Sequence, residues 1–117
     1  MSDVLTDLAY RNLLGVFNER DPAARAKAIE ETYAEDVVFH DPEGTTRGRE
    51  AIDGKVQTLL DGAPGFTFRP SGPARLSHDL VLLAWEFGPS DGPAVVSGID
   101  VSLVENGRIA TLHTMLN

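Results

Sequence analysis

The sequence predicts an α+β domain in which helices come first and a curved, mostly antiparallel sheet follows. Apolar residues in the first third of the chain recur at helical spacing. After residue 65, short runs of residues that favour β-strands are separated by turn residues. The expected order is helix, helix, strand, helix and then four strands. A length of 117 residues is typical of one domain, so we expect a single domain over residues 1–117.

Spacing and capping signals predict the two N-terminal helices. Leu13, Leu14 and Phe17 follow Tyr10 at i+3, i+4 and i+7, which places the four side chains on one face of a first helix. Asp21 can cap a second helix and Pro22 can occupy its first position. That second helix should run to about residue 34.

The middle of the chain predicts one strand and one more helix. The segment "DVVFH" is rich in β-branched and aromatic residues and is ended by Asp41-Pro42, which is typical of a short strand. The segment "GREAIDGKVQTLL" returns to helix, although Gly54 weakens it.

The last half predicts strands only. Their expected ranges are 66–77, 80–87, 94–104 and 108–116, with the turns "SHD", "GPSDGP" and "ENG" between them. Strands with such short connections can pair consecutively as antiparallel hairpins.

Charge and composition exclude several classes of partner. The formal net charge is −8 and no basic stripe is present, so neither nucleic acid nor a membrane surface is expected to bind. The start of the chain lacks the features of a signal peptide, and no apolar run approaches membrane-spanning length. Without cysteine there is no disulfide or thiolate site, and the expected compartment is the cytoplasm.

The order of elements, together with "YAEDVVFHDPEG", "GREAI", "LVLLAWEFG" and "GIDVSLVENGRIATLHTML", resembles the NTF2-like cone fold. Within that fold the chain is most similar to SnoaL-like proteins and ketosteroid isomerases, over nearly its whole length. The resemblance implies three N-terminal helices packed on a strongly curved, mostly antiparallel sheet. These motifs are specific for the fold and much less so for activity, since such cones serve as enzymes, binding proteins and dimerisation modules.

The resemblance also implies two catalytic aspartates. In the isomerases an Asp-Pro at the end of the first strand supplies the general base, which matches Asp41. A second aspartate, kept protonated, stabilises the enolate oxygen, and Asp100 in "GIDV" matches it. The tyrosine that completes the family's site falls at Leu13 here, and Tyr10 lies one helical turn earlier, about 5.4 Å along the axis.

Two functions follow from this partial match. The first is proton transfer next to a carbonyl, without a cofactor, by an isomerase-like or polyketide-cyclase-like enzyme. The second is a non-catalytic ligand-binding or dimerisation module that has the cone but lacks the complete site.

Asp41 has an ordinary interpretation beside the catalytic one. The segment from Asp41 to Gly44 satisfies a type I turn, with Asp first, Pro second and Gly fourth. Alternation places Val37, Phe39 and Asp41 on one face, so a strand with that face inward would carry the carboxylate into a cavity. The residues alone leave both roles open.

Asp100 likewise has two possible orientations. The strand around it has an apolar opposite face, which by itself predicts that Asp100 faces water. The cone requires the reverse: Asp100 lines the cavity and a second copy covers the apolar face. The cone therefore implies a homodimer through the outer sheet face, at Ile99, Val101, Leu103 and His113.

An apolar pocket for a small apolar or aromatic ligand, steroid-like or polyketide-like, completes what the resemblance implies. The residues expected to line it are Tyr10, Leu13, Phe39, Phe68, Trp85, Leu112, Thr114 and Leu116. Trp85 could equally be an ordinary core aromatic, and the pocket could be filled by its own side chains. The histidines lack the spacing of metal ligands, so no metal site is predicted.

Overall fold

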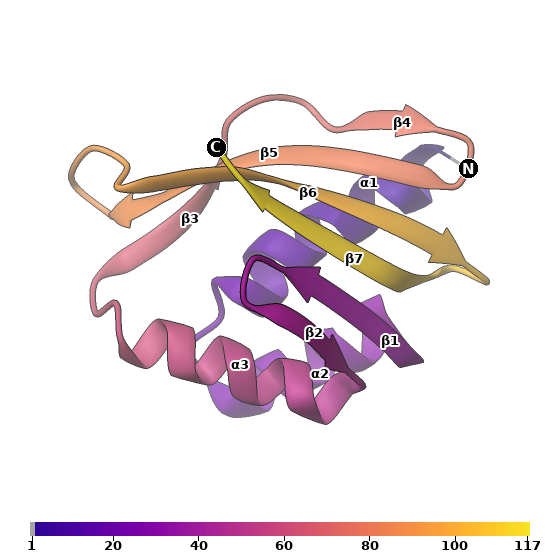
Figure 1. Cartoon of the computed structure of the whole chain (residues 1–117), viewed down its shortest axis with the longest axis horizontal. Helices are drawn as coiled ribbons and strands as arrows, with labels where there is room; N and C mark the ends of the chain where they lie inside the picture. Colours follow the sequence, from indigo (N-terminus) through magenta and orange to yellow (C-terminus); the bar gives the residue numbers. More distant parts are fainter. Residues whose placement is uncertain (1) are drawn as a thin grey trace.

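The computed structural model describes residues 2–117, which form helices on one side of a curved sheet (Figure 1). The helical part consists of α1 (Ser2–Tyr10), the π-helical segment η1 (Arg11–Phe17), α2 (Pro22–Thr32) and α3 (Arg49–Asp61). The strands are β1 (Tyr33–Asp41), β2 (Gly44–Arg47), β3 (Phe66–Pro70), β4 (Arg75–Ser77), β5 (Leu80–Pro89), β6 (Val96–Glu105) and β7 (Arg108–Leu116). This architecture confirms the predicted α+β cone.

The sheet order is β2-β1-β7-β6-β5-β3, with β4 also paired to β5. Every pair of neighbours is antiparallel except β1 and β7, which run parallel. The last strand therefore lies between the first strand and β6, with Phe39 opposite Leu112 and Asp100 opposite Thr114. This order brings the strand that carries Asp41 close to the strand that carries Asp100.

The pairing of the strands departs from the prediction at two places. The expected strand over 66–77 is divided into β3 and β4, because "PSGP" interrupts it with prolines that cannot donate to the ladder. Both pieces pair with β5 and not with each other. The turn after Asp41 leads into the short strand β2, which was not predicted from the sequence.

The first helix buries most of the predicted face, with Leu13 and Phe17 in the core and Tyr10 packed against it, but Leu14 departs from the prediction. Leu14 is 43% exposed, whereas Asn12 is 1% exposed. Both residues belong to η1, whose i→i+5 hydrogen bonds change the angle between successive side chains from that of an α-helix. The buried residues of η1 are therefore Asn12, Leu13, Val16 and Phe17.

The hydrophobic core fills the space between the helices and the inner face of the sheet. Its fully buried members include Val16, Ile52, Val56, Val81 and Ile109. No helix within residues 2–117 is both long and apolar enough to cross a membrane.

Candidate functional site

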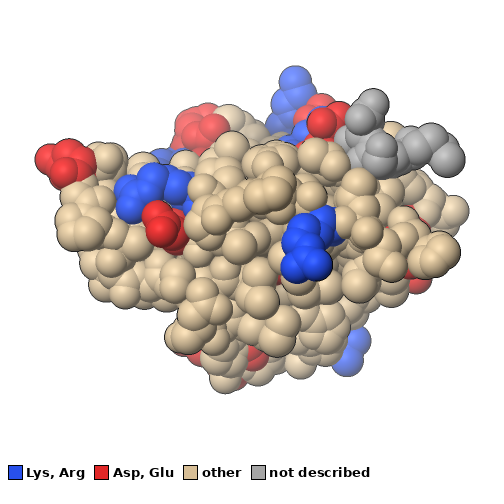
Figure 2. Space-filling model, turned by 90° about the horizontal axis from the view of Figure 1, so that it is seen from above, with Lys and Arg blue, Asp and Glu red and all other residues tan. Residues whose placement is uncertain are grey.

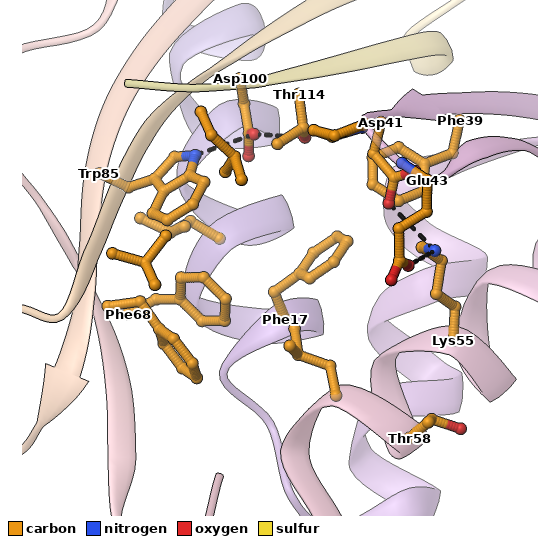
Figure 3. A pocket seen from close by; sticks show the side chains of 16 residues that line it. Phe17, Phe39, Asp41, Glu43, Lys55, Thr58, Phe68, Trp85, Asp100 and Thr114 are labelled. Atoms are coloured by element: carbon orange, nitrogen blue, oxygen red, sulfur yellow. Dashed lines mark hydrogen bonds and ion pairs between the residues drawn. The ribbon is translucent and has the colours of Figure 1, made fainter. Parts of the chain in front are cut away.

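A cavity of about 550 Å³ opens between the inner sheet face and the helical segments η1 and α3. Its mostly apolar lining includes five aromatic residues: Phe17, Phe39, Phe68, Trp85 and Phe87. The rings of Phe68 and Phe87 stack with their centroids 4.1 Å apart. Phe68 also meets Trp85 edge-on, with the centroids 5.3 Å apart, so the aromatic side chains of the wall support one another (Figure 3). This volume is in the range of small-molecule sites.

Both predicted catalytic residues line this cavity, as do six of the eight predicted ligand-binding residues. The six are Leu13, Phe39, Phe68, Trp85, Thr114 and Leu116. Leu112 is not part of the lining, because its side chain is fully enclosed in the hydrophobic core. Tyr10 is also outside the lining and packs half-buried against the core.

Asp100 faces the cavity and not the solvent. It is 8% exposed, and three side chains donate to its carboxyl group. Thr114 Oγ1 and Trp85 Nε1 donate to Oδ1 at 2.7 and 3.0 Å, and Asn12 Nδ2 donates to Oδ2 at 3.1 Å. Burial raises the pKa of Asp100 to about 6, although these three donors act in the opposite direction.

Asn12 and Tyr33 form a second layer behind Asp100. The Tyr33 hydroxyl donates to Asn12 Oδ1, while the other end of the same amide donates to Asp100. Both residues are buried. Burial, and secondarily the nearby charge of Asp100, raises the pKa of Tyr33 well above its usual value. The sequence did not predict a role for either residue: Asn12 lies in the π-helical segment, which has no clear sequence signal, and Tyr33 falls within the range predicted for the second helix but begins β1.

Asp41 is at once a turn residue and a cavity residue. Its Oδ1 accepts from the backbone N–H groups of Glu43 and Gly44 at 3.0 and 3.2 Å, as in the predicted turn. Its Oδ2 lies 3.0 Å from Lys55 Nζ at the cavity wall (Figure 3). The two interpretations that the residues had left open are therefore compatible.

Lys55 of α3 joins the Asp41 turn to the helix. Its Nζ lies 2.6 Å from Glu43 Oε1 as well as contacting Asp41. The hydrogen bond to Glu43 is the largest cause that raises the pKa of Lys55. Figure 3 shows this cluster on one side of the cavity, with the Asp100 cluster on another and aromatic rings between them. Lys55 was not among the residues predicted for the site.

The histidines lie apart from this constellation. His40 and His113 stack on neighbouring strands with their ring centroids 4.6 Å apart. In the part of the chain that the structure describes, no group of three or more His, Cys, Asp or Glu residues is arranged to hold a metal ion.

Comparisons with known proteins agree with this architecture. A "putative isomerase of the SnoaL-like family" from Agrobacterium tumefaciens is similar, with a TM-score of 0.90 and 24% identity over 100% of this chain and 99% of that one. A "putative polyketide cyclase" from Sinorhizobium meliloti has a TM-score of 0.75 and 21% identity over 98% and 99%. An NTF2-like protein of unknown function from Cytophaga hutchinsonii has a TM-score of 0.73 and 18% identity over 97% and 89%.

At these identities the solved structures support the fold alone. A search of curated proteins found no match. The family model of the SnoaL-like domain matches residues 10–112, which is most of the chain. The chain therefore belongs to the SnoaL-like domain family of the NTF2-like superfamily.

Proposed function

We propose that this chain binds a small, flat hydrophobic molecule and catalyses proton transfer at the carbon next to its carbonyl group, without a cofactor. The observation that carries the proposal is that Asp41 and Asp100 open into one apolar cavity. Acid–base catalysis needs two groups with different tasks, and these two have different surroundings. Asp41 lies beside a cation, whereas Asp100 is enclosed among neutral donors.

In this mechanism Asp41 is the base. As a carboxylate beside the Lys55 ammonium group, Asp41 can accept a proton from the carbon next to the carbonyl. Asp100 in its protonated form donates a hydrogen bond to the carbonyl oxygen as negative charge develops there. With a pKa of about 6, about a tenth of Asp100 is protonated at pH 7. A ligand that excludes water favours that form further.

The cavity supports a substrate class as well as a reaction type. Its aromatic walls suit a flat polycyclic or polyketide-like ring system, and its volume of about 550 Å³ suits a small one. Isomerisation or cyclisation of such a ketone fits the two carboxyl groups. The "isomerase" and "cyclase" in the names of the two SnoaL-like structures above are consistent with this chemistry.

A non-catalytic ligand-binding module is the second candidate. Two observations favour it: the position where the isomerases carry a tyrosine is Leu13, and one oxygen of Asp41 is engaged by two backbone N–H groups. Such a protein would bind the same ligands without turning them over.

Exchange of hydrogen for deuterium separates the two candidates without knowledge of the natural substrate. The probe is 2-tetralone, a flat bicyclic ketone with acidic hydrogens next to its carbonyl, followed by NMR in D₂O. An enzyme accelerates the exchange, and Asp41→Asn slows it by about 100-fold or more. The matched control Glu105→Gln, at an exposed surface carboxylate, should leave the rate unchanged.

Binding is measured in parallel by thermal shift. The ketone should stabilise the protein more than tetralin, the hydrocarbon of the same shape, because only the ketone accepts a bond from protonated Asp100. This preference should weaken as the pH rises above about 6 and disappear in Asp100→Ala. Binding without exchange would favour the non-catalytic module, and failure of both measurements would overturn the ligand proposal.

We also propose that the chain forms a homodimer through the outer face of β5, β6 and β7. Helices lie on the opposite side of the sheet, and the outer face carries few charged groups (Figures 1 and 2). With Asp100 directed inward, its neighbours Ile99, Val101 and Leu103 belong to this outer face, and His113 pairs with Val101. A second copy would cover their apolar side chains.

A further inference from the structure

We propose that Asn12 is a positioning residue that holds the Asp100 carboxyl group and, locked by Tyr33, leaves the Asp100 proton free for the ligand. This inference rests on the proposed function, because it concerns the hydrogen-bond donor of that site. It assigns roles to two buried residues that do not line the cavity themselves.

The hydrogen bonds determine which carboxyl oxygen can carry the proton. Oδ1 of Asp100 already accepts from Thr114 and Trp85, so both of its lone-pair positions are used. Oδ2 accepts only from Asn12 among the bonds described above. The proton of the neutral form therefore belongs on Oδ2, at the lone-pair position that Asn12 leaves open.

The orientation of the Asn12 amide decides whether that proton reaches a ligand. In the observed orientation the NH₂ group faces Asp100, and an NH₂ group can only donate. In the reversed orientation the amide oxygen would face Asp100 and accept its proton, so the proton would no longer be available to a carbonyl in the cavity.

Tyr33 holds the amide in the observed orientation. Its hydroxyl donates to Asn12 Oδ1, and the tyrosine side chain is completely buried. Reversal would direct the NH₂ group at the hydroxyl and leave the hydroxyl hydrogen without an acceptor, which is unfavourable for a buried donor. Tyr33 therefore acts as a lock on Asn12, and through it on Asp100.

The protein contains a built-in probe for the test. Trp85 is the only tryptophan in the chain, and its indole N–H donates to Asp100 at 3.0 Å. Fluorescence emission followed against pH should therefore titrate with a midpoint near 6, the pKa of Asp100. Asp41, Glu43 and Lys55 line the same cavity, so the transition must vanish in Asp100→Asn to be assigned to Asp100.

Two variants separate positioning from simple packing. Asn12→Leu removes a donor to the ionised carboxylate and should raise the midpoint by about one to two pH units. Tyr33→Phe removes a single oxygen, frees the amide to reverse and should also raise the midpoint. Ser102→Ala, at a buried position two residues along β6 from Asp100, is the control and should leave the midpoint unchanged.

Ketone binding then distinguishes the role of Tyr33, which fixes the orientation of the Asn12 amide, from the role of Asn12, which donates to Asp100. In Asn12→Leu the preference for 2-tetralone over tetralin should persist to higher pH, because the proton stays available. In Tyr33→Phe the preference should fall, because the reversed amide accepts the proton. If both variants prefer 2-tetralone over tetralin equally, Tyr33 does not lock the amide. If the fluorescence midpoint is unchanged in Tyr33→Phe and in any folded Asn12→Leu, Asn12 does not position Asp100.

The fluorescence titration needs neither ligand nor activity, so it decides the role of Asn12 even if the proposed function fails. Absence of ketone binding in the wild type, together with shifted midpoints in the variants, would refute the function and leave the positioning of Asp100 intact.

Discussion

At the scale of single residues, Asp100 links the candidate chemistry to the stability of the fold. Its pKa is about 6 in the folded chain and 3.8 in the unfolded reference, so between these values the folded state binds more protons. Stability from this group is therefore greatest below pH 3.8 and falls as the pH rises to about 6, by about 3 kcal/mol in total. Asp100→Asn cannot ionise, so relative to the wild type it should become more stable by up to that amount between pH 4 and pH 7. Urea unfolding at four pH values measures this, and parallel curves would contradict it.

Gly98 is the residue that makes room for Trp85. A Cβ atom at this position would lie 2.5 Å from the Met115 carbonyl oxygen and 2.7 Å from Trp85 Cζ2. Gly98→Ala should therefore destabilise the fold by about 1–3 kcal/mol and move the indole away from Asp100. The matched control is Gly54→Ala in α3, where a Cβ meets nothing within 4 Å and should stabilise the helix by about 0.5–1 kcal/mol. Equal unfolding free energies for the two variants would refute this account.

The strand residues of the site were predictable only with the help of the family resemblance. Alternation groups Phe39 with Asp41 but does not say which way that face points, and for Asp100 it predicts a position in water. The resemblance places all three at the cavity, which they line. Asn12 and Lys55 were not predictable, because their roles depend on partners far along the chain: Asp100 for one, Asp41 for the other. Periodicity in the sequence predicts on which face of an element a side chain lies, but it does not predict which residues that side chain contacts.

At the scale of elements, Arg25 connects α2 to α3. It is 2% exposed and donates to Asp53 Oδ1 at 2.6 Å, to the Glu19 carbonyl at 2.7 Å and to Gln57. Arg25→Met should destabilise the fold by about 2–4 kcal/mol, because these acceptors lose their donor. The double change Arg25→Met with Asp53→Leu should recover part of the loss, since no charge is then left unpaired. Thermal unfolding of both variants measures this, and a double variant less stable than the single one would contradict it.

The elements themselves were predicted best where local signals agree. The Asp21 cap and Pro22 mark the start of α2 correctly, and the Asp21 side chain accepts from Ala24 N. The predicted strand over 108–116 matches β7. The π-helical segment η1, the parallel pairing of β1 with β7 and the strand β2 could not be deduced in the same way. The π-helical segment and the parallel pairing depend on tertiary packing. The hairpin follows from the predicted turn at Asp41–Gly44, and only its second strand was not predicted.

At the scale of the whole molecule, the inward orientation of Asp100 has a consequence for assembly. Alternation along β6 then directs Ile99, Val101 and Leu103 to the face away from the helices (Figure 1). Apolar side chains on that face are the kind that a second copy buries, and a stable dimer buries about 800 Å² on each partner. The carboxyl group of Asp100 in the cavity and the apolar outer face therefore both follow from the alternation of side chains along β6.

Val101→Glu tests this assembly at its proposed centre. A glutamate there would place like charges within an apolar interface between two copies, at a cost in desolvation that the rest of the face cannot offset. Light scattering should show dimers for the wild type and monomers for the variant at equal concentration. The matched control is Ala51→Glu, an equal change of charge at an exposed position of α3 on the other side of the sheet, which should remain dimeric. A wild type that is monomeric at every concentration would overturn the dimer while leaving the cavity and its two carboxyl groups as they are.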